Sequence, residues 1–202
     1  MADAHGNADA VRVAVDRLDG RVERLLMVGD AMDQYRFSNE VLELIMQRGM
    51  AYVLGNHERT ILSLHGDRAR AASHVKPELV AFLRTVPERL LLELDGKRLL
   101  MVHGSPWPPY DDYVYPGSQL LERFAELGVD YVTTGHTHVR LLTRVGSTLI
   151  VNPGSVGESR DPTLGRLLSY AVLDTCSDEV TFETFEDPSL PAALLHGDES
   201  FG

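Results

Sequence analysis

Short apolar runs alternate with amphipathic segments along the first half of the chain. The runs at 25–28 and 51–54 are each followed by a glycine, a pattern typical of buried strands. Segments 7–20 and 38–49 instead repeat apolar residues at helical spacing, with asparagine or serine as the N-cap and glycine near the end. This strand–loop–helix alternation predicts an α/β fold with functional groups at the carboxyl ends of its strands.

The second half of the chain is richer in strand patterns. Between 59 and 86 the pattern is helical but mixed, and a further helix is expected at about 118–127. Asp95-Gly96 separates two apolar runs and is a strong signal for a hairpin turn. The strands of this half are expected at 90–94, 99–102, 131–134, 140–144, 148–151, 167–173 and 180–185.

Length and composition fit one domain of a globular protein. No repeat or linker divides the 202 residues, so we expect a single domain over 1–202, with about 188–202 as a frayed tail. The net charge of -11 argues against nucleic-acid binding but not against a small phosphate ester, because bound dications reverse the local field. The single cysteine, Cys176, excludes an internal disulfide. Because the chain has neither a bilayer-spanning apolar run nor a signal-peptide pattern, we expect a cytoplasmic protein with no membrane partner.

Two histidines one residue apart follow the apolar run 131–134. Residues two apart on an extended backbone point to the same side, so His136 and His138 are presented together, as a metal site requires. Such a pair is common on protein surfaces when it stands alone. Here four stretches upstream add nitrogen or oxygen ligands at strand exits. They supply Asp3 and His5, Asp30, Asn56 and His57, and His103.

The chemistry of this set favours two divalent cations. It offers six or seven nitrogen and oxygen ligands and no thiolate, and one small cation cannot use them all. We expect Mn²⁺, with Fe, Ni²⁺, Zn²⁺ or Mg²⁺ as alternatives. Ordinary interpretations remain for single stretches: Asp30 as a turn residue, Asn56 as a helix N-cap, and Glu58 as a first-turn carboxylate facing the helix dipole.

Aromatic and basic residues offer candidates for a substrate rim. We expect Tyr35, Arg36 and Tyr113 to contact substrate, with Trp107 and Tyr110 in the same group. Aromatic, proline-rich loops also often simply pack against a core, so both interpretations stay open.

The order D-x-H, GD-x-x-D, GNHE, HG and GHTH resembles the calcineurin-like metallophosphoesterases over nearly the whole chain. The likeness is greatest to small bacterial single-domain phosphodiesterases, which combine an HGN opening with HGSP and a late VNPGSVG. Five motifs in order, each at a strand exit, are a far stronger signal than any one of them. The resemblance implies a four-layer α/β/β/α sandwich.

The resemblance also implies a role for each candidate residue. Asp3, His5 and His138 would hold the first metal, and Asn56, His103 and His136 the second, while Asp30 would bridge both. His57 would lie beside the metals and protonate the leaving oxygen, after attack by hydroxide held between the metals. Asp33 would hydrogen-bond His57 and raise its basicity.

Two departures from the family pattern bear on this interpretation. Members usually have an apolar strand immediately before D-x-H, but here only Met1-Ala2 precede Asp3. The start is therefore expected to be truncated or misassigned; if the strand is absent, Asp3 and His5 lie on a loose terminus and the first metal binds poorly. The second departure is Gln34, where serine/threonine protein phosphatases carry an arginine, which disfavours that activity.

The sequence thus predicts a phosphodiesterase for a small, nucleotide-type phosphodiester. A phosphomonoesterase or dinucleoside-polyphosphate hydrolase is the enzyme alternative, because the same centre serves both. The non-enzyme alternative is a scaffold with a degraded metal site, as in the retromer subunit of this fold.

Overall fold

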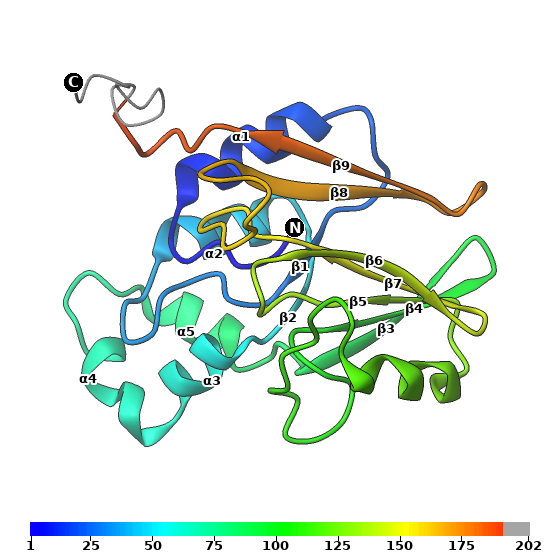
Figure 1. Ribbon diagram of the computed structural model, residues 1–202. Helices are drawn as coiled ribbons and strands as arrows, with labels where there is room; N and C mark the ends of the chain where they lie inside the picture. The colour runs from blue at the N-terminus through cyan, green and yellow to red at the C-terminus, as the bar shows by residue number, and fades with distance from the viewer. Residues whose placement is uncertain (192–202) are drawn as a thin grey trace, which may run out of the picture.

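The strands of the computed structural model lie in three sheets, and helices cover their outer faces (Figure 1). The structure describes residues 1–191, so most of the expected tail at 188–202 lies outside the described residues. The helices are α1 (Ala8–Leu18), α2 (Asn39–Gln47), α3 (Asn56–Leu62), α4 (Asp67–Arg70) and α5 (Pro77–Leu83), with 3-10 helices η1 (Leu64–Gly66) and η2 (Gln119–Leu127). The strands are β1 (Leu26–Val28), β2 (Ala51–Val53), β3 (Arg89–Leu94), β4 (Lys97–Val102), β5 (Tyr131–Thr133), β6 (Arg140–Val145), β7 (Thr148–Pro153), β8 (Leu168–Asp174) and β9 (Glu179–Phe185).

The five-stranded sheet packs against the β1–β2 and β8–β9 sheets, and the alternation of side chains along the strands explains these layers. The five-stranded sheet has the order β3-β4-β5-β7-β6, with β4, β5 and β7 parallel. Leu99 and Met101 of β4 face β1, β2 and the β8–β9 hairpin, whereas Leu100 and Val102 face η2. Helices α1, α2 and α5 pack on the other face of β1 and β2. These layers form the predicted α/β/β/α sandwich.

The predicted hairpin turns and helix caps are confirmed. Asp95 (φ 51°) and Gly96 (φ 77°) join β3 to β4 with positive φ at both positions, the geometry that matches the twist of paired strands. The Asn7 side chain accepts a hydrogen bond from Ala10 N and caps α1, and Ser38 caps α2 through Val41 N.

The helix expected at 118–127 is a 3-10 helix. Leu121, Phe124 and Leu127 recur every three residues and pack together on the five-stranded sheet. This spacing matches the three residues per turn of a 3-10 helix better than the 3.6 of an α-helix. Gly128 ends it in the left-handed conformation, with φ 62°.

Residues 1–4 are held on both sides, so the expected loose terminus is not found. Val28 N donates to Met1 O (2.9 Å) and Asp3 N donates to Gly29 O (3.1 Å), which continues the hydrogen bonding of β1. On the other side Val156 N donates to Ala2 O (2.9 Å). A Cβ on Gly157 would lie 1.9 Å from the Ala4 carbonyl oxygen, so only glycine permits this approach.

The first residues of the expected tail also form a defined contact. Asp187 is buried, and its carboxylate accepts hydrogen bonds from Asn7 Nδ2 (2.9 Å) and Ser189 N (2.9 Å). Only residues 188–191 of the expected tail belong to the described residues, and the fraying of 188–202 stays a prediction. In residues 1–191 no helix combines the length and apolarity that crossing a bilayer requires.

Candidate metal centre

The predicted ligands converge where the loops after β1, β2, β4 and β5 meet residues 3–5. Three groups of acidic and histidine side chains form there, and in each group the ligand atoms lie within 4.8 Å of one another. The groups are Asp3, His5 and His138; His5, Asp30 and His57; and Asp30, His103 and His136. Because His5 and Asp30 each belong to two groups, the three form one continuous site.

The backbone of this site is strained. Non-glycine residues rarely adopt positive φ, and such strain gathers at functional sites. Five of the seven predicted ligand residues adopt it: Asp3 (57°), His5 (47°), Asp30 (50°), His136 (68°) and His138 (56°). The surrounding hydrogen bonds, rather than local preference, therefore hold these side chains inward.

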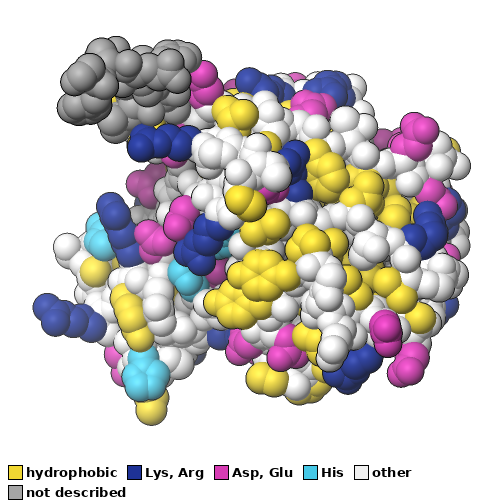
Figure 2. Space-filling model, viewed as in Figure 1, with side chains coloured by type: hydrophobic (Ala, Val, Ile, Leu, Met, Phe, Trp, Pro, Cys, Tyr) yellow, Lys and Arg dark blue, Asp and Glu magenta, His cyan; other side chains and the backbone are white. Residues whose placement is uncertain are grey.

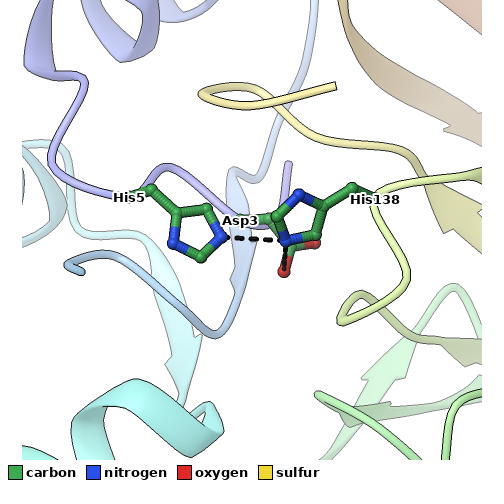
Figure 3. A group of neighbouring side chains, drawn as sticks. All are labelled: Asp3, His5 and His138. Carbon is green, nitrogen blue, oxygen red and sulfur yellow. Dashed lines mark hydrogen bonds and ion pairs between the residues drawn. The ribbon is translucent and has the colours of Figure 1, made fainter. Parts of the chain in front are cut away.

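The first group brings together residues 133 positions apart in the chain (Figure 3). His5 Nε2 lies 2.9 Å from His138 Nε2, which in turn lies 3.5 Å from Asp3 Oδ1. His138 Nδ1 donates to Glu158 O at 2.6 Å, so the neutral ring carries its proton there and keeps a lone pair on Nε2. The ligand atoms of Asp3, His5 and His138 are thus close enough together to bind one divalent cation.

The second group lies on the other side of Asp30. His103 Nε2 is 3.2 Å from Asp30 Oδ2 and 3.2 Å from Asn56 Oδ1. His136 belongs to the same cluster, and its ring centroid lies 5.0 Å from that of His103. The carboxylate of Asp30 is therefore within reach of both groups, as the predicted bridging role requires.

Backbone carbonyls fix the orientation of the other imidazoles. His103 Nδ1 pairs with Val28 O (2.8 Å), and His136 Nε2 pairs with Asp111 O (3.1 Å). A ring nitrogen that donates to a carbonyl leaves the opposite nitrogen free as a ligand. His103 therefore presents Nε2 to the centre, and His136 presents Nδ1.

Burial and mutual charge control protonation at the site. Burial raises the pKa of Asp3 to about 8, and burial with the neighbouring His103 lowers the pKa of His136 to about 4. Burial and His5 lower the pKa of His138 to about 3. Burial alone would lower the pKa of His103, but Asp30 beside it raises it to about 10. The neutral imidazoles of His136 and His138 are available as ligands. Bound cations would replace the protons on Asp3 and His103.

His57 lies at the edge of the centre. Its backbone N donates to Asp30 Oδ1 (3.0 Å), its Nδ1 pairs with Met32 O (3.1 Å), and its Nε2 lies 3.8 Å from Asp30 Oδ2. The side chain is partly exposed, in contrast to the buried His103 and His138. The ring of His57 is thus partly open to solvent and lies beside Asp30 and His5.

Asp33 does not pair with His57, which corrects the prediction from the sequence. The nitrogen expected to donate a hydrogen bond to the Asp33 carboxylate, His57 Nδ1, is paired with Met32 O instead. Asp33 Oδ1 lies 3.3 Å from His5 Nδ1. The turn in which Arg36 N donates to Asp33 O directs the carboxylate toward the N-terminal loop.

The predicted rim residues lie in three different places. Tyr113 stacks on His136, so the structure brings it to the site. Tyr35 and Arg36 are exposed in the turn that follows Asp33, on the same side as His5. Trp107 packs against Phe124 in the core over η2.

Two buried residues, which the sequence did not single out for this role, orient the site. Glu58 accepts hydrogen bonds from Asp30 N (2.9 Å) and Gly55 N (2.7 Å). Asn152 donates to Gly135 O (2.7 Å) and to Thr137 Oγ1 (3.1 Å), which holds the GHTH loop. Their position next to the motifs, within GNHE and VNPG, is the only sequence signal that could have pointed to them.

The chain is similar in sequence and fold to known phosphoesterases. The chain is 27% identical to a metallophosphoesterase from Sphaerobacter thermophilus of known structure, with a TM-score of 0.74 over 93% of this chain and 87% of that one. It is 25% identical to an uncharacterized protein of Methanocaldococcus jannaschii over 86% of this chain and 81% of that protein. A novel archaeal phosphodiesterase has the same fold, at 21% identity and a TM-score of 0.60 over 92% of this chain and 97% of that one.

The family model described as a calcineurin-like phosphoesterase superfamily domain matches residues 1–178. That match includes all the residues of the three ligand groups. The chain belongs to the calcineurin-like phosphoesterase superfamily.

Proposed function

We propose that the protein is a phosphodiesterase that uses two divalent cations, with Mn²⁺ the expected metal, on a small nucleotide-type ester. One observation carries the proposal. The Asp30 carboxylate lies between two groups of ligand atoms, each of which suits one cation.

The chain's residues would divide between the two cations as follows. Asp3, His5 and His138 hold the first, Asn56, His103 and His136 hold the second, and Asp30 contacts both. The cations supply two effects: they lower the pKa of a bound water and neutralise the charge of the phosphate. Two dications with the two buried carboxylates, Asp3 and Asp30, leave a local charge of about +2, which attracts an anionic ester.

In the proposed reaction His57 donates the proton that the leaving alkoxide needs. The bond between His57 Nδ1 and Met32 O holds the ring so that Nε2 faces the centre. A proton on Nε2 can then pass to the departing oxygen, a step typical of a histidine general acid.

The basic residues near the centre favour a diester over a monoester. A monoester carries one more negative charge and calls for additional free cationic groups. Arg140 instead pairs with Asp161 (2.9 Å), and Arg160 pairs with Glu158 (3.2 Å). Arg59 is likewise paired with Asp111. These three arginines are therefore already paired with carboxylates, whereas Arg36 lies exposed in the turn after Asp33.

Turnover of two matched aryl esters tests the proposal. Metal is removed with a chelator, and the protein is reloaded with Mn²⁺, Zn²⁺ or Mg²⁺. Its hydrolysis rates on bis(p-nitrophenyl) phosphate and p-nitrophenyl phosphate are then compared. We expect metal-dependent hydrolysis with the diester preferred, and two metal ions per chain by elemental analysis. Asp30→Asn, which keeps the size of the side chain, should lose both metal and activity. A protein that binds two metals but cleaves neither ester would instead support the scaffold function.

A further inference from the structure

Two exposed tyrosines form a continuous aromatic surface that begins at a proposed metal ligand. The ring of Tyr113 lies 3.8 Å from the His136 ring, with 19° between their planes. The ring of Tyr115 lies 6.0 Å from Tyr113, with 9° between their planes. Tyr113 is 50% exposed and Tyr115 is 45% exposed. The stack therefore extends from the centre into solvent.

The loop that carries these tyrosines is fixed at several points. Arg59 of α3 donates to Pro109 O (2.6 Å) and forms an ion pair with Asp111, whose carbonyl pairs with His136. Ser105 Oγ donates to the Asp112 carboxylate at 2.7 Å. Figure 2 shows hydrophobic side chains gathered beside a histidine on this face of the molecule.

Packing of the loop does not account for the two tyrosines. Val114, between them, is 2% exposed and joins the core cluster around Phe124, so it anchors this part of the loop. The alternation turns both tyrosine rings outward. Large aromatic surface left exposed beside a catalytic centre is characteristic of a binding site.

We propose that Tyr113 and Tyr115 bind a planar ring of the substrate, a nucleobase or an aryl group, by stacking. This inference rests on the proposed function and specifies its substrate class. An aromatic face accepts any planar ring, and one stacked base is worth about 1–3 kcal/mol by alanine substitution. The stack begins at His136, so this aromatic surface adjoins the proposed metal centre where the phosphate would bind.

Binding of two phosphates that differ only in the ring tests the inference. Calorimetry on the metal-loaded protein compares AMP with ribose 5-phosphate, which carries the same phosphate and sugar but no base. We expect AMP to bind about tenfold more tightly, the factor that corresponds to about 1.4 kcal/mol. Equal dissociation constants for the two ligands would overturn the inference.

Variants of the two tyrosines separate stacking from structural damage. Tyr115→Leu, which does not touch His136, should reduce the preference for AMP at least threefold, and Tyr113→Leu should do the same. Tyr115→Phe keeps the ring and should keep the preference. Leu91→Ala, an exposed apolar residue of β3, is the control. An AMP preference unchanged in both leucine variants would contradict the proposal.

The test also separates this inference from the proposed function. Preference for AMP without hydrolysis of any ester would keep the aromatic site and reject the phosphodiesterase. Ester hydrolysis with no preference for AMP would support the phosphodiesterase and reject the aromatic site. Metal content is measured for each variant, so that loss of metal is not mistaken for loss of stacking.

Discussion

Glu58 Oε2 accepts a hydrogen bond from Asp30 N at 2.9 Å, and this contact joins the loop after β1 to the loop after β2. The same oxygen accepts from Gly55 N at 2.7 Å, and the other accepts from Met32 N at 3.3 Å. Burial raises the pKa of Glu58, and its side chain is fully buried. A Cβ on Gly55 would lie 2.1 Å from Asp30 Oδ1, so the two loops touch directly.

Glu58→Gln should weaken both folding and metal binding. The amide NH₂ replaces an acceptor that faces backbone donors, which leaves a buried donor unpaired and costs about 1–3 kcal/mol. Thermal unfolding and metal content measure the two effects. Glu78→Gln, in the exposed first turn of α5, should change neither. Full metal content in Glu58→Gln would show that Glu58 does not position Asp30.

Asp33→Asn should act on the first metal group rather than on the proton donor. Asp33 Oδ1 lies 3.3 Å from His5 Nδ1, and loss of such an orienting carboxylate typically weakens metal affinity by about 10–100-fold. Calorimetric metal titration checks this, with the exposed Asp9→Asn as control. Normal metal affinity with reduced turnover would return Asp33 to its predicted place behind His57.

His57→Ala should keep the metals and lose most of the turnover. A general acid contributes about 10²–10⁴-fold, and His57 is partly exposed at the edge of the cluster. His65→Ala, an exposed histidine of η1, is the matched control. If His57→Ala loses metal as well as activity, His57 is a ligand.

Removal of metal should lower the melting temperature. A cation at about 100 times its Kd stabilises the folded state by about 2.7 kcal/mol, and at this chain length each kcal/mol shifts Tm by about 2–4 °C. Chelation should therefore lower Tm by about 5–10 °C, and added Mn²⁺ should restore it. An identical Tm with and without chelator would argue against a metal site in the folded protein.

The strands, hairpins and caps could be predicted because local pattern determines them. Asp95-Gly96 has the residues that a two-residue turn needs, and Asn7 and Ser38 have the side chains that cap helices. The form of η2 was not predicted, because Leu121, Phe124 and Leu127 fit either helix type until they meet the sheet.

The order of the motifs predicted that the ligands converge. It did not predict the hydrogen-bond partners of Asp33 and Glu58. The family resemblance implied that Asp33 pairs with His57, whereas the observed turn presents it to His5. In the sequence, Glu58 is an ordinary carboxylate of a first helical turn. Its bond to Asp30 N forms only when the loop after β1 packs against it. Such contacts depend on tertiary packing, which local pattern does not encode.

The orienting partners of four histidines are main-chain oxygens, those of Met32, Val28, Asp111 and Glu158. Side chains at these four positions can therefore vary without turning an imidazole. An alanine scan would remove the side chains at these positions but would leave the four carbonyl oxygens in place. Replacing a single amide by an ester linkage, which weakens the carbonyl as an acceptor, is the change that would reveal their contribution.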